Sequence, residues 1–570
     1  MAQIQDGLTR TAELLQLIKI LITDRIAQEG INLLYSQLPE AQIDERPGLK
    51  PDELKAIIGD YHALVVRSET QVTSDVLAAA TNLKIVGRAG VGVDNIDTEA
   101  ATRLGIIVVN SPTGNIIAAA EHTVAMLMSL ARHIPAAAAN MKAGKWEKSR
   151  FLGVEVRHKV LGVIGLGKVG MAVARRAQGL EMQIIAFDPF VSPEQARKAD
   201  VTMMSVEEVL QQADFVTLHT SLTSGPQGTK GLIGERELQL MKPGARLINC
   251  ARGGLIDEEA LLKALNENHL AGVALDVFSQ EPIRDHELLN KLVAHERVIT
   301  TPHLGASTEE AQVGVATDVA EQIVSVLRGG LPRAAVNAPL ILPETLKTLQ
   351  PYMTLLEKIG RLYTQLQPGP LSKIELSYSG EIASYDLRPL QAALIKGLLE
   401  SVSDAHVNLI NAQLLAKERG LEIVEQKSTT PAEFANQVTL RVASKNGYAS
   451  SLTNNEHIDG LSGTVMHGEP RIVRVGQYWT EFVPEGYILF CRNIDQPGMI
   501  GHVGTILGKA GVNIRHMDVG PSVRKARNYD PKRATEPALM VISVDNAIPD
   551  WALHEIRGAG DIFGVKVVNL

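Results

Sequence analysis

Short apolar runs and amphipathic segments alternate along the first part of the chain. The runs are rich in β-branched residues and predict strands, while the stretches between them, such as PDELKAII and IDTEAATRLG, have the spacing of helices with one apolar face. Strands that alternate with helices predict a parallel sheet covered on both faces. The predicted strands are KILIT, ALVVR, KIVG and IIVV, within residues 19–110.

A second alternation of the same kind follows a long helical pattern, IIAAAEHTVAMLMSLARH. Its predicted strands are VLGVIG, QIIAFD, ADFVTLHT, ARLINCA, AGVALDVF and RVITTPH. The segment after them has a helical pattern with one apolar face, and we expect it to pack back onto the first sheet. We therefore predict a first lobe from residues 19–118 and 306–330, a second lobe from residues 119–305, and a pocket between the two.

Two further units follow the lobes. Residues 331–351 are rich in proline, which predicts a linker. Residues 352–480 mix strands and helices in a third unit, and residues 484–570 form a fourth unit with the βαββαβ order of a ferredoxin-like domain. The predicted fold class is α/β, with two doubly wound parallel-sheet lobes, the first of them discontinuous, followed by an α+β unit and a βαββαβ unit.

Composition sets the broad class of the protein. A chain of 570 residues exceeds what one core supports, and a formal net charge of −8 gives no sign of a nucleic-acid or membrane partner. Two cysteines, Cys250 and Cys491, are too few for a disulfide framework. Since the N-terminal segment lacks the pattern of a signal peptide and no run of about 18 apolar residues occurs, we expect a cytoplasmic protein.

A glycine motif opens the second lobe. In VIGLGKVG, Gly165, Gly167 and Gly170 form G-x-G-x-x-G between a predicted strand and a predicted helix. Glycine clusters also occur in ordinary turns, but Asp188 ends the next strand at about the distance where dinucleotide folds place the acid that binds ribose hydroxyls. A carboxylate there repels a 2′-phosphate, and the next residues, Pro189 and Phe190, offer no compensating arginine. The motif therefore predicts a Rossmann domain that binds NAD rather than NADP. No metal site is predicted.

Three ionisable residues lie at the carboxyl ends of predicted strands in the second lobe: Arg252 in NCARGG, Glu281 in DVFSQEP and His303 in TPHLGAS. Taken singly, each type of residue is more often a solvated loop residue or a structural one. Together at one edge they suit the oxidation of an alcohol. His303 has an ordinary pKa near working pH and suits a general base, Glu281 suits the fixing of its tautomer, and Arg252 suits a substrate carboxylate.

Six stretches carry a resemblance to a known family. The stretches GRAGVGVDNID, NSPTGN, VIGLGKVG, NCARGG, ALDVFSQEP and PHLGAST resemble the D-2-hydroxyacid dehydrogenases, and residues 19–570 resemble the long-form D-3-phosphoglycerate dehydrogenases among them. The resemblance implies that Arg252, Glu281 and His303 form the catalytic set, that the first lobe binds substrate, and that NAD is the cofactor. The further cofactor-binding residues that it implies are Lys168, Val169, Asp188, Thr220, Cys250, Ala251, Arg252, Asp276, His303, Leu304, Gly305 and Ala306.

The implied reaction is the oxidation of D-3-phosphoglycerate, the first step of phosphorylated L-serine synthesis. A substrate with a carboxylate and a phosphate needs several cations, and Arg67 and Arg88 both end strands that point to the proposed cleft. The backbone amides of Gly90 and Val91 suit a carboxylate. Asn110 and Lys145 complete the predicted substrate set. Lys145 lies with Lys142 and Lys148 around Trp146, which in the family lies near a neighbouring subunit's active site; a solvated helix end is the alternative.

The last two units carry the remaining predictions. The fourth unit resembles an ACT domain, with the implied effector L-serine bound by Asn493, Asp495 and Asn513. The third unit resembles the intervening domain of the long-form enzymes, in which Arg471 and Arg474 bind anions or are ordinary edge-strand charges. The family implies a homo-oligomer, a dimer or a tetramer.

Two rival functions share the lobes. NAD-sensing corepressors have the same two lobes but lack an ACT-like unit, and related enzymes act on glyoxylate, formate or phosphite. One departure from the family is a basic stretch within residues 521–537, PSVRKARNYDPKRATEP, where a short hairpin is usual. It either changes how the regulatory units associate or is a surface loop.

Overall fold

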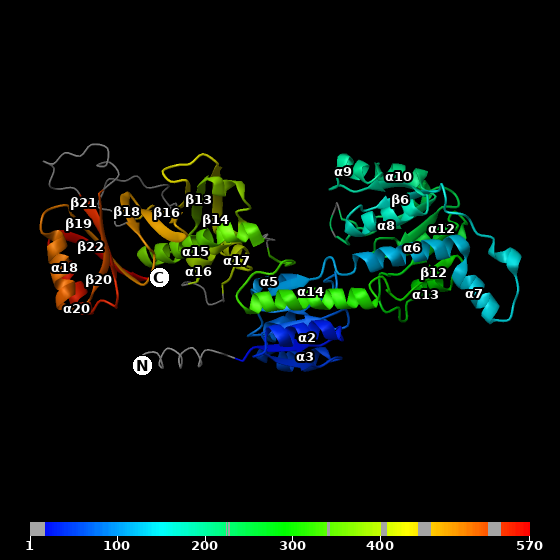
Figure 1. Ribbon diagram of the computed structural model, residues 1–570, viewed down its shortest axis with the longest axis horizontal. Coiled ribbons are helices and arrows are strands. Elements are labelled where there is room, and N and C mark those ends of the chain that lie inside the picture. Colours follow the sequence, from blue (N-terminus) through cyan, green and yellow to red (C-terminus); the bar gives the residue numbers. More distant parts are fainter. Residues whose placement is uncertain are drawn as a thin grey trace.

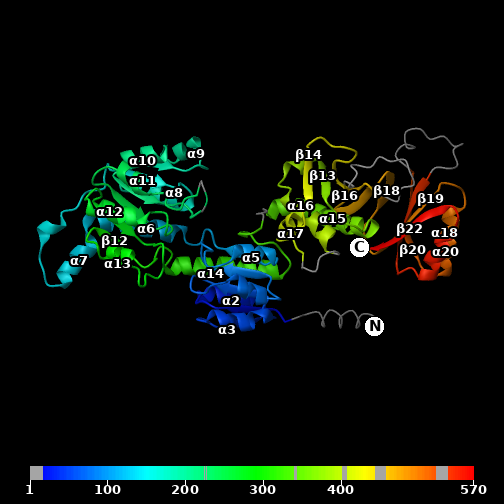
Figure 2. The same ribbon diagram turned by 180° about the vertical axis from the view of Figure 1, so that it is seen from behind.

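The computed structural model describes residues 17–223, 225, 228–338, 343–400, 407–442, 458–521 and 537–570. The molecule is elongated, and its units follow one another along the long axis in the order second lobe, first lobe, third unit and fourth unit (Figures 1 and 2). The predicted fold class is confirmed, since two wholly parallel sheets are followed by a mixed sheet and an antiparallel one. Within the described residues, no helix combines the length and apolar character needed to cross a membrane.

The first lobe is a five-stranded parallel sheet in the order β2-β1-β3-β4-β5. Helix α14, far along the chain, packs closely on this sheet. Val319 of the helix lies so near Gly87 of β4 that a Cβ added at Gly87 would be 2.5 Å from it. The lobe is thus discontinuous, as predicted. Its elements are β1 (Lys19–Ile22), α2 (Gln28–Gln37), β2 (Gln42–Glu45), α3 (Pro51–Ile57), β3 (Ala63–Val66), α4 (Ser74–Ala79), β4 (Ile85–Arg88), α5 (Thr98–Arg103), β5 (Ile107–Asn110) and α14 (Glu309–Leu327).

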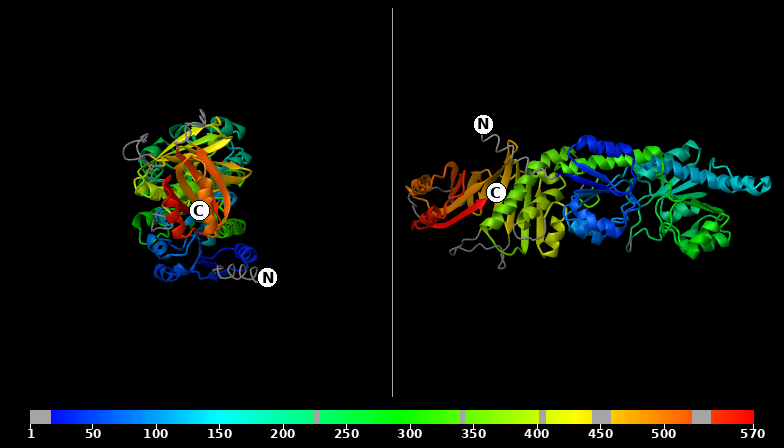
Figure 3. Two further views of the ribbon diagram at one scale, coloured as in Figure 1. Left: turned by 90° about the vertical axis from the view of Figure 1, so that its left-hand side faces the viewer. Right: turned by 90° about the horizontal axis from the view of Figure 1, so that it is seen from below.

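The second lobe is a seven-stranded parallel sheet in the order β12-β11-β10-β9-β6-β7-β8. Helix α6 (Ile116–Arg132) leads into this lobe and packs against α8, and α7 (Ile134–Lys142) extends beyond it (Figure 3). The other elements are β6 (Val160–Ile164), α8 (Lys168–Gly179), β7 (Gln183–Phe187), α9 (Pro193–Lys198), β8 (Thr202–Met203), α10 (Val206–Gln212), β9 (Phe215–Leu218), α11 (Glu235–Leu240), β10 (Arg246–Asn249), α12 (Glu258–Asn266), β11 (Gly272–Leu275), α13 (Glu287–Ala294) and β12 (Val298–Thr300).

One hydrophobic core is common to the third and fourth units, and the fourth unit has a second core of its own on the other face of its sheet. The third unit has a six-stranded mixed sheet, β14-β13-β15-β16-β17-β18, and the fourth has the ferredoxin-like order β20-β21-β19-β22. Ile488, Phe490 and Val541 of the fourth unit belong to the same buried cluster as Leu355 and Ile359 of the third. The elements are α15 (Pro343–Leu366), β13 (Lys373–Gly380), α16 (Arg388–Leu399), α17 (Ala412–Glu418), β14 (Glu422–Ser428), β15 (Asn436–Val442), β16 (Gly460–Met466), β17 (Glu469–Val475), β18 (Tyr478–Phe482), β19 (Tyr487–Ile494), α18 (Met499–Lys509), β20 (Ile514–Pro521), β21 (Pro537–Val544), α20 (Asp550–Arg557) and β22 (Ile562–Asn569).

The predicted linker differs from the structure in its second half. Helix α15 begins at Pro343, so residues 343–351 are helical rather than extended. Proline at the start of a helix is tolerated because the first amides have no partner within the helix. Burial of the apolar side chains Leu349, Tyr352 and Met353 supports the helix through the second proline, Pro351. Most of the basic stretch at 521–537 lies outside the described residues, so its two interpretations stay predictions.

Candidate active site

A cleft of about 690 Å³ lies between the two lobes, at the carboxyl ends of their parallel strands. In open α/β sheets this is the edge where ligands bind. The first lobe contributes strand-end and loop residues that were predicted to bind substrate, and the second contributes the three predicted catalytic residues. Those predicted residues in the lining are Arg67, Arg88, Gly90, Val91, Arg252, Glu281 and His303, with Ala306 from the predicted cofactor set.

His303 and Glu281 form a close pair at the second lobe's side of the cleft. His303 Nδ1 lies 2.6 Å from Glu281 Oε2, and the other oxygen of Glu281 accepts a hydrogen bond of 2.9 Å from the amide of Phe278. The hydrogen bond with Glu281 outweighs desolvation and raises the pKa of His303. Because Nδ1 is engaged by the carboxylate, Nε2 is the ring nitrogen left to exchange a proton with a substrate.

Asp276 holds the turn that carries His303. Its side chain is fully buried and accepts hydrogen bonds from the Thr301 hydroxyl at 2.5 Å, the Leu304 amide at 2.7 Å and the Gly305 amide at 2.8 Å. Desolvation opposes ionisation of this carboxyl, but hydrogen bonds from His122, Thr301 and Leu304 hold its pKa below the usual value. The ionised carboxylate therefore fixes the turn, in which His303 has a φ of 54°.

His122 is a site residue that the motifs do not predict. It belongs to α6, and its Nε2 lies 3.2 Å from Asp276 Oδ1 and 3.2 Å from the Thr301 hydroxyl. The signal in the sequence is a lone histidine on a mostly apolar helix, and such a histidine is more often structural. Its contact with the carboxylate behind the His303 turn depends on how α6 crosses the second sheet.

Three arginines line the cleft from both lobes. Burial, and then the nearby guanidinium of Arg252, lower the pKa of Arg88 to about 10. Arg252 Nε lies 3.6 Å from Asp94 Oδ2, so an ion pair joins the second lobe to the first. Its Nη1 donates to the carbonyl of Ala251 at 2.8 Å. Cations gathered in this way favour a ligand with more than one negative charge.

The glycine loop fits a dinucleotide. Gly165 has a φ of 95°, which other residues rarely adopt, and a side chain at Gly170 would come within 2.0 Å of the Gly165 carbonyl. A side chain at Gly167 would meet no atom within 4 Å, which leaves room for a phosphate to approach. The hydroxyl oxygen of Thr220 is buried and has no partner among the described residues, so it can bind a cofactor.

Other predicted cofactor residues surround this loop. Lys168 and Val169 begin α8 directly after the glycines. The carboxylate of Asp188 accepts from the amides of Leu166 at 2.8 Å and Phe190 at 2.8 Å, which holds it beside the loop. Burial raises the pKa of the Cys250 thiol to about 12, so this thiol stays neutral near pH 7.

Two predicted substrate residues lie outside the cleft lining. Asn110 lies behind it and donates to the carbonyl of Val91 at 2.5 Å, so it supports the backbone that was predicted to hold the carboxylate. Lys145 is exposed in the turn after α7, next to Trp146, whose exposed fraction is 81%. Within the described part of this chain, Lys145 does not contribute to the lining.

The predicted effector residues lie in the fourth unit. Asn493 is 2% exposed, and its side-chain oxygen has no partner in the described ranges. Asn513 donates to Asp545 at 2.7 Å, and Asp495 lies in the loop after β19. In the third unit, Arg471 pairs with Glu469 at 3.2 Å, and the Arg474 side chain donates to the Gly476 carbonyl at 2.8 Å.

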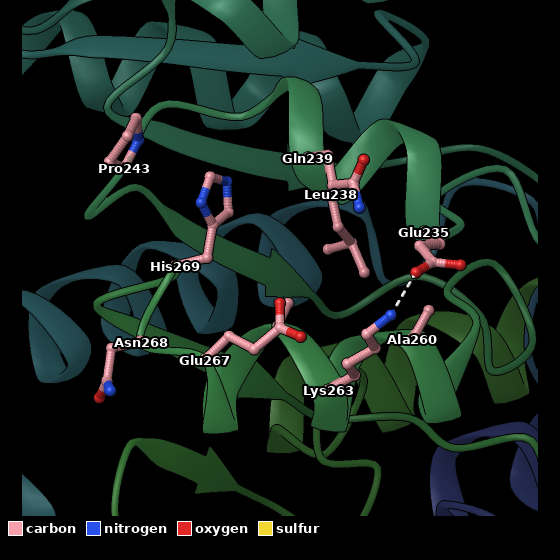
Figure 4. A pocket seen from close by; sticks show the side chains of 10 residues that line it. Glu235, Leu238, Gln239, Pro243, Ala260, Lys263, Glu267, Asn268 and His269 are labelled. Carbon is pink, nitrogen blue, oxygen red and sulfur yellow. Dashed lines mark hydrogen bonds and ion pairs between the residues drawn. The ribbon is translucent and has the colours of Figure 1, made fainter.

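A second hollow, of about 310 Å³, lies near the amino ends of β10 and β11, away from the cleft (Figure 4). It is lined by α11, α12 and the residues that precede β10 and β11. Lys263 pairs there with Glu235 at 2.6 Å, and His269 Nε2 lies 3.0 Å from the Met241 carbonyl. None of the residues predicted to act on substrate or cofactor lines it. Among the described residues, no group of three His, Cys, Asp or Glu side chains is placed to hold a metal ion.

Family models match three parts of the chain. The model of the D-isomer specific 2-hydroxyacid dehydrogenase NAD binding domain matches residues 124–305. The model of the D-3-phosphoglycerate dehydrogenase intervening domain matches residues 348–476, and the ACT domain model matches residues 487–549. These matches cover the second lobe and most of the third and fourth units.

Curated relatives are similar over nearly the whole chain. The D-3-phosphoglycerate dehydrogenase of Synechocystis sp. is 44% identical over 96% of this chain and 95% of its own length. That of Methanocaldococcus jannaschii is 41% identical over 97% of this chain and 100% of its own.

Solved structures match a little over half of the chain. The TT0316 protein of Thermus thermophilus is 32% identical with a TM-score of 0.51, and covers 56% of this chain and 100% of that chain. D-lactate dehydrogenase of Aquifex aeolicus, complexed with NAD and lactic acid, is 25% identical with a TM-score of 0.51, and covers 56% of this chain and 99% of that chain.

Proposed function

Since the chain belongs to the D-3-phosphoglycerate dehydrogenase family, we propose that it oxidises D-3-phosphoglycerate to 3-phosphohydroxypyruvate with NAD, the first step of phosphorylated L-serine synthesis. The observation that carries the proposal is the 2.6 Å contact between His303 and Glu281 in a cleft that three arginines also line. Oxidation of a secondary alcohol needs a base for the hydroxyl proton and a fixed cation for the carboxylate. The cleft holds both.

His303 is the proposed general base. With Nδ1 donating to Glu281, the neutral ring presents a lone pair at Nε2, which takes the proton of the substrate C2 hydroxyl. The carbon–hydrogen bond at C2 breaks at the same time, and NAD, when bound, supplies the acceptor for that hydride. Glu281 then stabilises the imidazolium that forms. The products are the 2-oxo acid, NADH and one proton.

The arginines are proposed to bind the two acidic groups of the substrate. Arg252, which lines the cleft together with His303, orients the carboxylate with help from the amides of Gly90 and Val91. Arg67 and Arg88 bind the phosphate. A planar guanidinium suits both oxyanions because it donates two parallel hydrogen bonds.

Steady-state kinetics with two substrates tests the proposal. NADH formation from D-3-phosphoglycerate is measured with removal of the product, because oxidation of an alcohol by NAD is unfavourable near neutral pH. Unphosphorylated D-glycerate and D-lactate are the comparison substrates. A second function, oxidation of a short hydroxy acid, is suggested by the D-lactate dehydrogenase structure to which the chain is similar. Equal kcat/KM on all three substrates, or equal losses in an Arg67→Ala variant, favours that second function.

L-Serine is the proposed effector of the fourth unit, which matches the ACT domain model. Asn493 supports the proposal because its buried side-chain oxygen has no partner in the described residues. Asn493, Asp495 and Asn513 are proposed to bind the amino and carboxylate groups of the amino acid. Titration of the enzyme with L-serine and D-serine tests this, and equal effects of both enantiomers, or none, contradict it.

A homo-oligomer is the proposed assembly. Helix α7 has no buried residue in the single chain, and Ile134, Met141 and Trp146 are each more than half exposed. Exposed apolar side chains in one segment favour an interface. Light scattering of the full chain at several concentrations tests this, and a monomer at micromolar concentration contradicts it.

A further inference from the structure

The two arginines proposed to bind phosphate are held by a single amide side chain, that of Asn95. Asn95 lies between the glycine-rich stretch after β4 and the start of α5. Its Nδ2 donates to the carbonyl of Arg67 at 2.7 Å and to the carbonyl of Thr70 at 2.6 Å. Its Oδ1 accepts from Arg88 Nε at 3.2 Å. The Asn95 side chain thus contacts the guanidinium of Arg88 directly and the backbone of the 67–70 loop that carries Arg67.

Asp24 holds the loop of residues 67–70 from its other side. This carboxylate follows β1 and is 2% exposed. It accepts from the amide of Arg67 at 2.5 Å, from the amide of Thr70 at 3.2 Å and from the Thr70 hydroxyl at 2.5 Å. The loop that carries Arg67 is therefore fixed at its amides by Asp24 and at its carbonyls by Asn95.

The arginine side chains of the cleft need fixed positions because their positive charges repel one another. Arg88 is desolvated and faces the guanidinium of Arg252 across the cleft, and both circumstances disfavour its charge. A pocket that gathers like charges before its ligand arrives must hold them by other contacts. The Asn95 side chain supplies such a contact to Arg88 directly and to Arg67 through its backbone.

We propose that Asn95 is a positioning residue for phosphate recognition, which sets the distance between Arg67 and Arg88 so that both guanidiniums bind one phosphate. The inference rests on the proposed function, and it deepens it by assigning the preference for a phosphorylated substrate to a residue that does not itself line the cleft. The backbone carbonyl of Asn95 accepts from the amide of Val72 at 2.8 Å, and this bond survives any side-chain substitution.

Two variants separate the donor and acceptor contributions of the Asn95 side-chain amide. Asn95→Asp keeps the size and an oxygen that accepts from Arg88, but it loses the donor to the carbonyls of Arg67 and Thr70. Asn95→Ala loses both. For each variant, kcat and KM are measured with D-3-phosphoglycerate and with D-glycerate, which differ only in the phosphate, and KM is measured for NAD. Thermal melting of each variant is compared with that of the unaltered chain.

We expect the KM for D-3-phosphoglycerate to rise about ten- to one-hundredfold in Asn95→Ala, as for lost hydrogen bonds to charged groups, and less in Asn95→Asp. The kcat/KM for D-glycerate and the KM for NAD change by less than about threefold. In an Arg67→Ala, Arg88→Ala background, Asn95→Ala then adds little, because its effect acts through these two side chains.

Three outcomes overturn the inference. The first is an equal loss on both substrates, which indicates a structural role. The second is an unchanged preference for the phosphorylated substrate in a folded Asn95→Ala variant, or in Asn95→Asp if the alanine variant does not fold. The third is full additivity with the arginine variants. If the unaltered chain already turns over both substrates equally, the proposed function itself fails, and this result is distinguishable because it needs no variant.

Discussion

At the scale of single residues, Glu281 controls the protonation of His303. The hydrogen bond that His303 donates to the Glu281 carboxylate raises the pKa of His303, so the imidazolium persists to a higher pH than in a free histidine. With His303 as the proposed base, oxidation needs the neutral ring, and we expect the rate to rise with pH through this raised pKa. We expect Glu281→Gln to move the midpoint of the rise in kcat/KM to lower pH. The plateau rate should fall by about one to two orders of magnitude, because the ring loses its fixed tautomer.

The pH profile of kcat/KM in the oxidation direction is the measurement. Glu258→Gln is a matched control, because this carboxylate accepts from Ser279 in the same loop, and its replacement removes the same charge without contact to the ring. A midpoint that stays in place in Glu281→Gln, or that moves equally in Glu258→Gln, rejects the assigned cause of the shift.

Asp94 pairs with Arg252, the arginine proposed to bind the substrate carboxylate. The two side chains are 3.6 Å apart, and Asp94 is 74% exposed, so the ion pair is weak and a substrate carboxylate can displace it. We expect Asp94→Asn to lower the KM for D-3-phosphoglycerate by about two- to fivefold, with less change in kcat, since exposed pairs contribute at most about 1 kcal/mol. Asp75→Asn removes the same charge from an exposed site on α4 and should leave KM unchanged. A KM that rises in Asp94→Asn shows that the carboxylate helps substrate binding instead.

At the scale of elements, the third glycine of the motif, Gly170, leaves the least room for a side chain. A methyl group at Gly170 would come within 2.0 Å of the Gly165 carbonyl, so α8 must move away from β6 in Gly170→Ala. We expect a loss of about 1 to 3 kcal/mol of stability, as for overpacked sites, and weaker NAD binding. Gly179→Ala is the control in the same helix, because its methyl group meets no atom within 4 Å and alanine favours a helix.

Denaturant unfolding and the quenching of protein fluorescence by NADH measure the two effects. Gly179→Ala should keep NADH affinity and unfold at an equal or higher denaturant concentration. If Gly170→Ala binds NADH as tightly as Gly179→Ala does, the close packing of α8 on the loop is not what shapes the cofactor site.

The sequence predicts elements well where one local signal decides them. The β-branched runs of the two lobes became strands, whereas β2, with only one buried residue in QIDE, and β8, with two residues, lacked such a signal. The start of α15 is not predicted because its prolines indicate a linker, while the burial of Leu349 and Tyr352 that stabilises the helix depends on tertiary packing. In the same way, motifs pointed to Glu281 and His303, but the contacts of Asn95 depend on how separate loops meet in space.

At the scale of the whole molecule, the third and fourth units are expected to fold as one body. Their sheets meet around a common core, and a side chain at Gly520 of β20 would come within 1.8 Å of the Trp479 carbonyl in β18. Five buried side chains of the fourth unit belong to this core, namely Ile488, Phe490, Leu539, Val541 and Val568. Exposure of such side chains costs about 1.5 to 3 kcal/mol each, and their sum is comparable with the whole stability of a small domain.

We therefore expect a fragment of residues 343–570 to unfold in one cooperative transition, and a fragment of residues 484–570 to expose an apolar sheet face. Circular dichroism, binding of an apolar dye and NMR dispersion distinguish the two, and residues 343–482 serve as the reciprocal control. Native-like dispersion in the 484–570 fragment as a monomer would contradict the shared core. If the longer fragment behaves as one body, an effector bound to the fourth unit acts on the lobes through movements of both units together. In the described part of the chain, contacts of Asn408, Asn411 and Glu418 with residues 103–105 join the third unit to the first lobe.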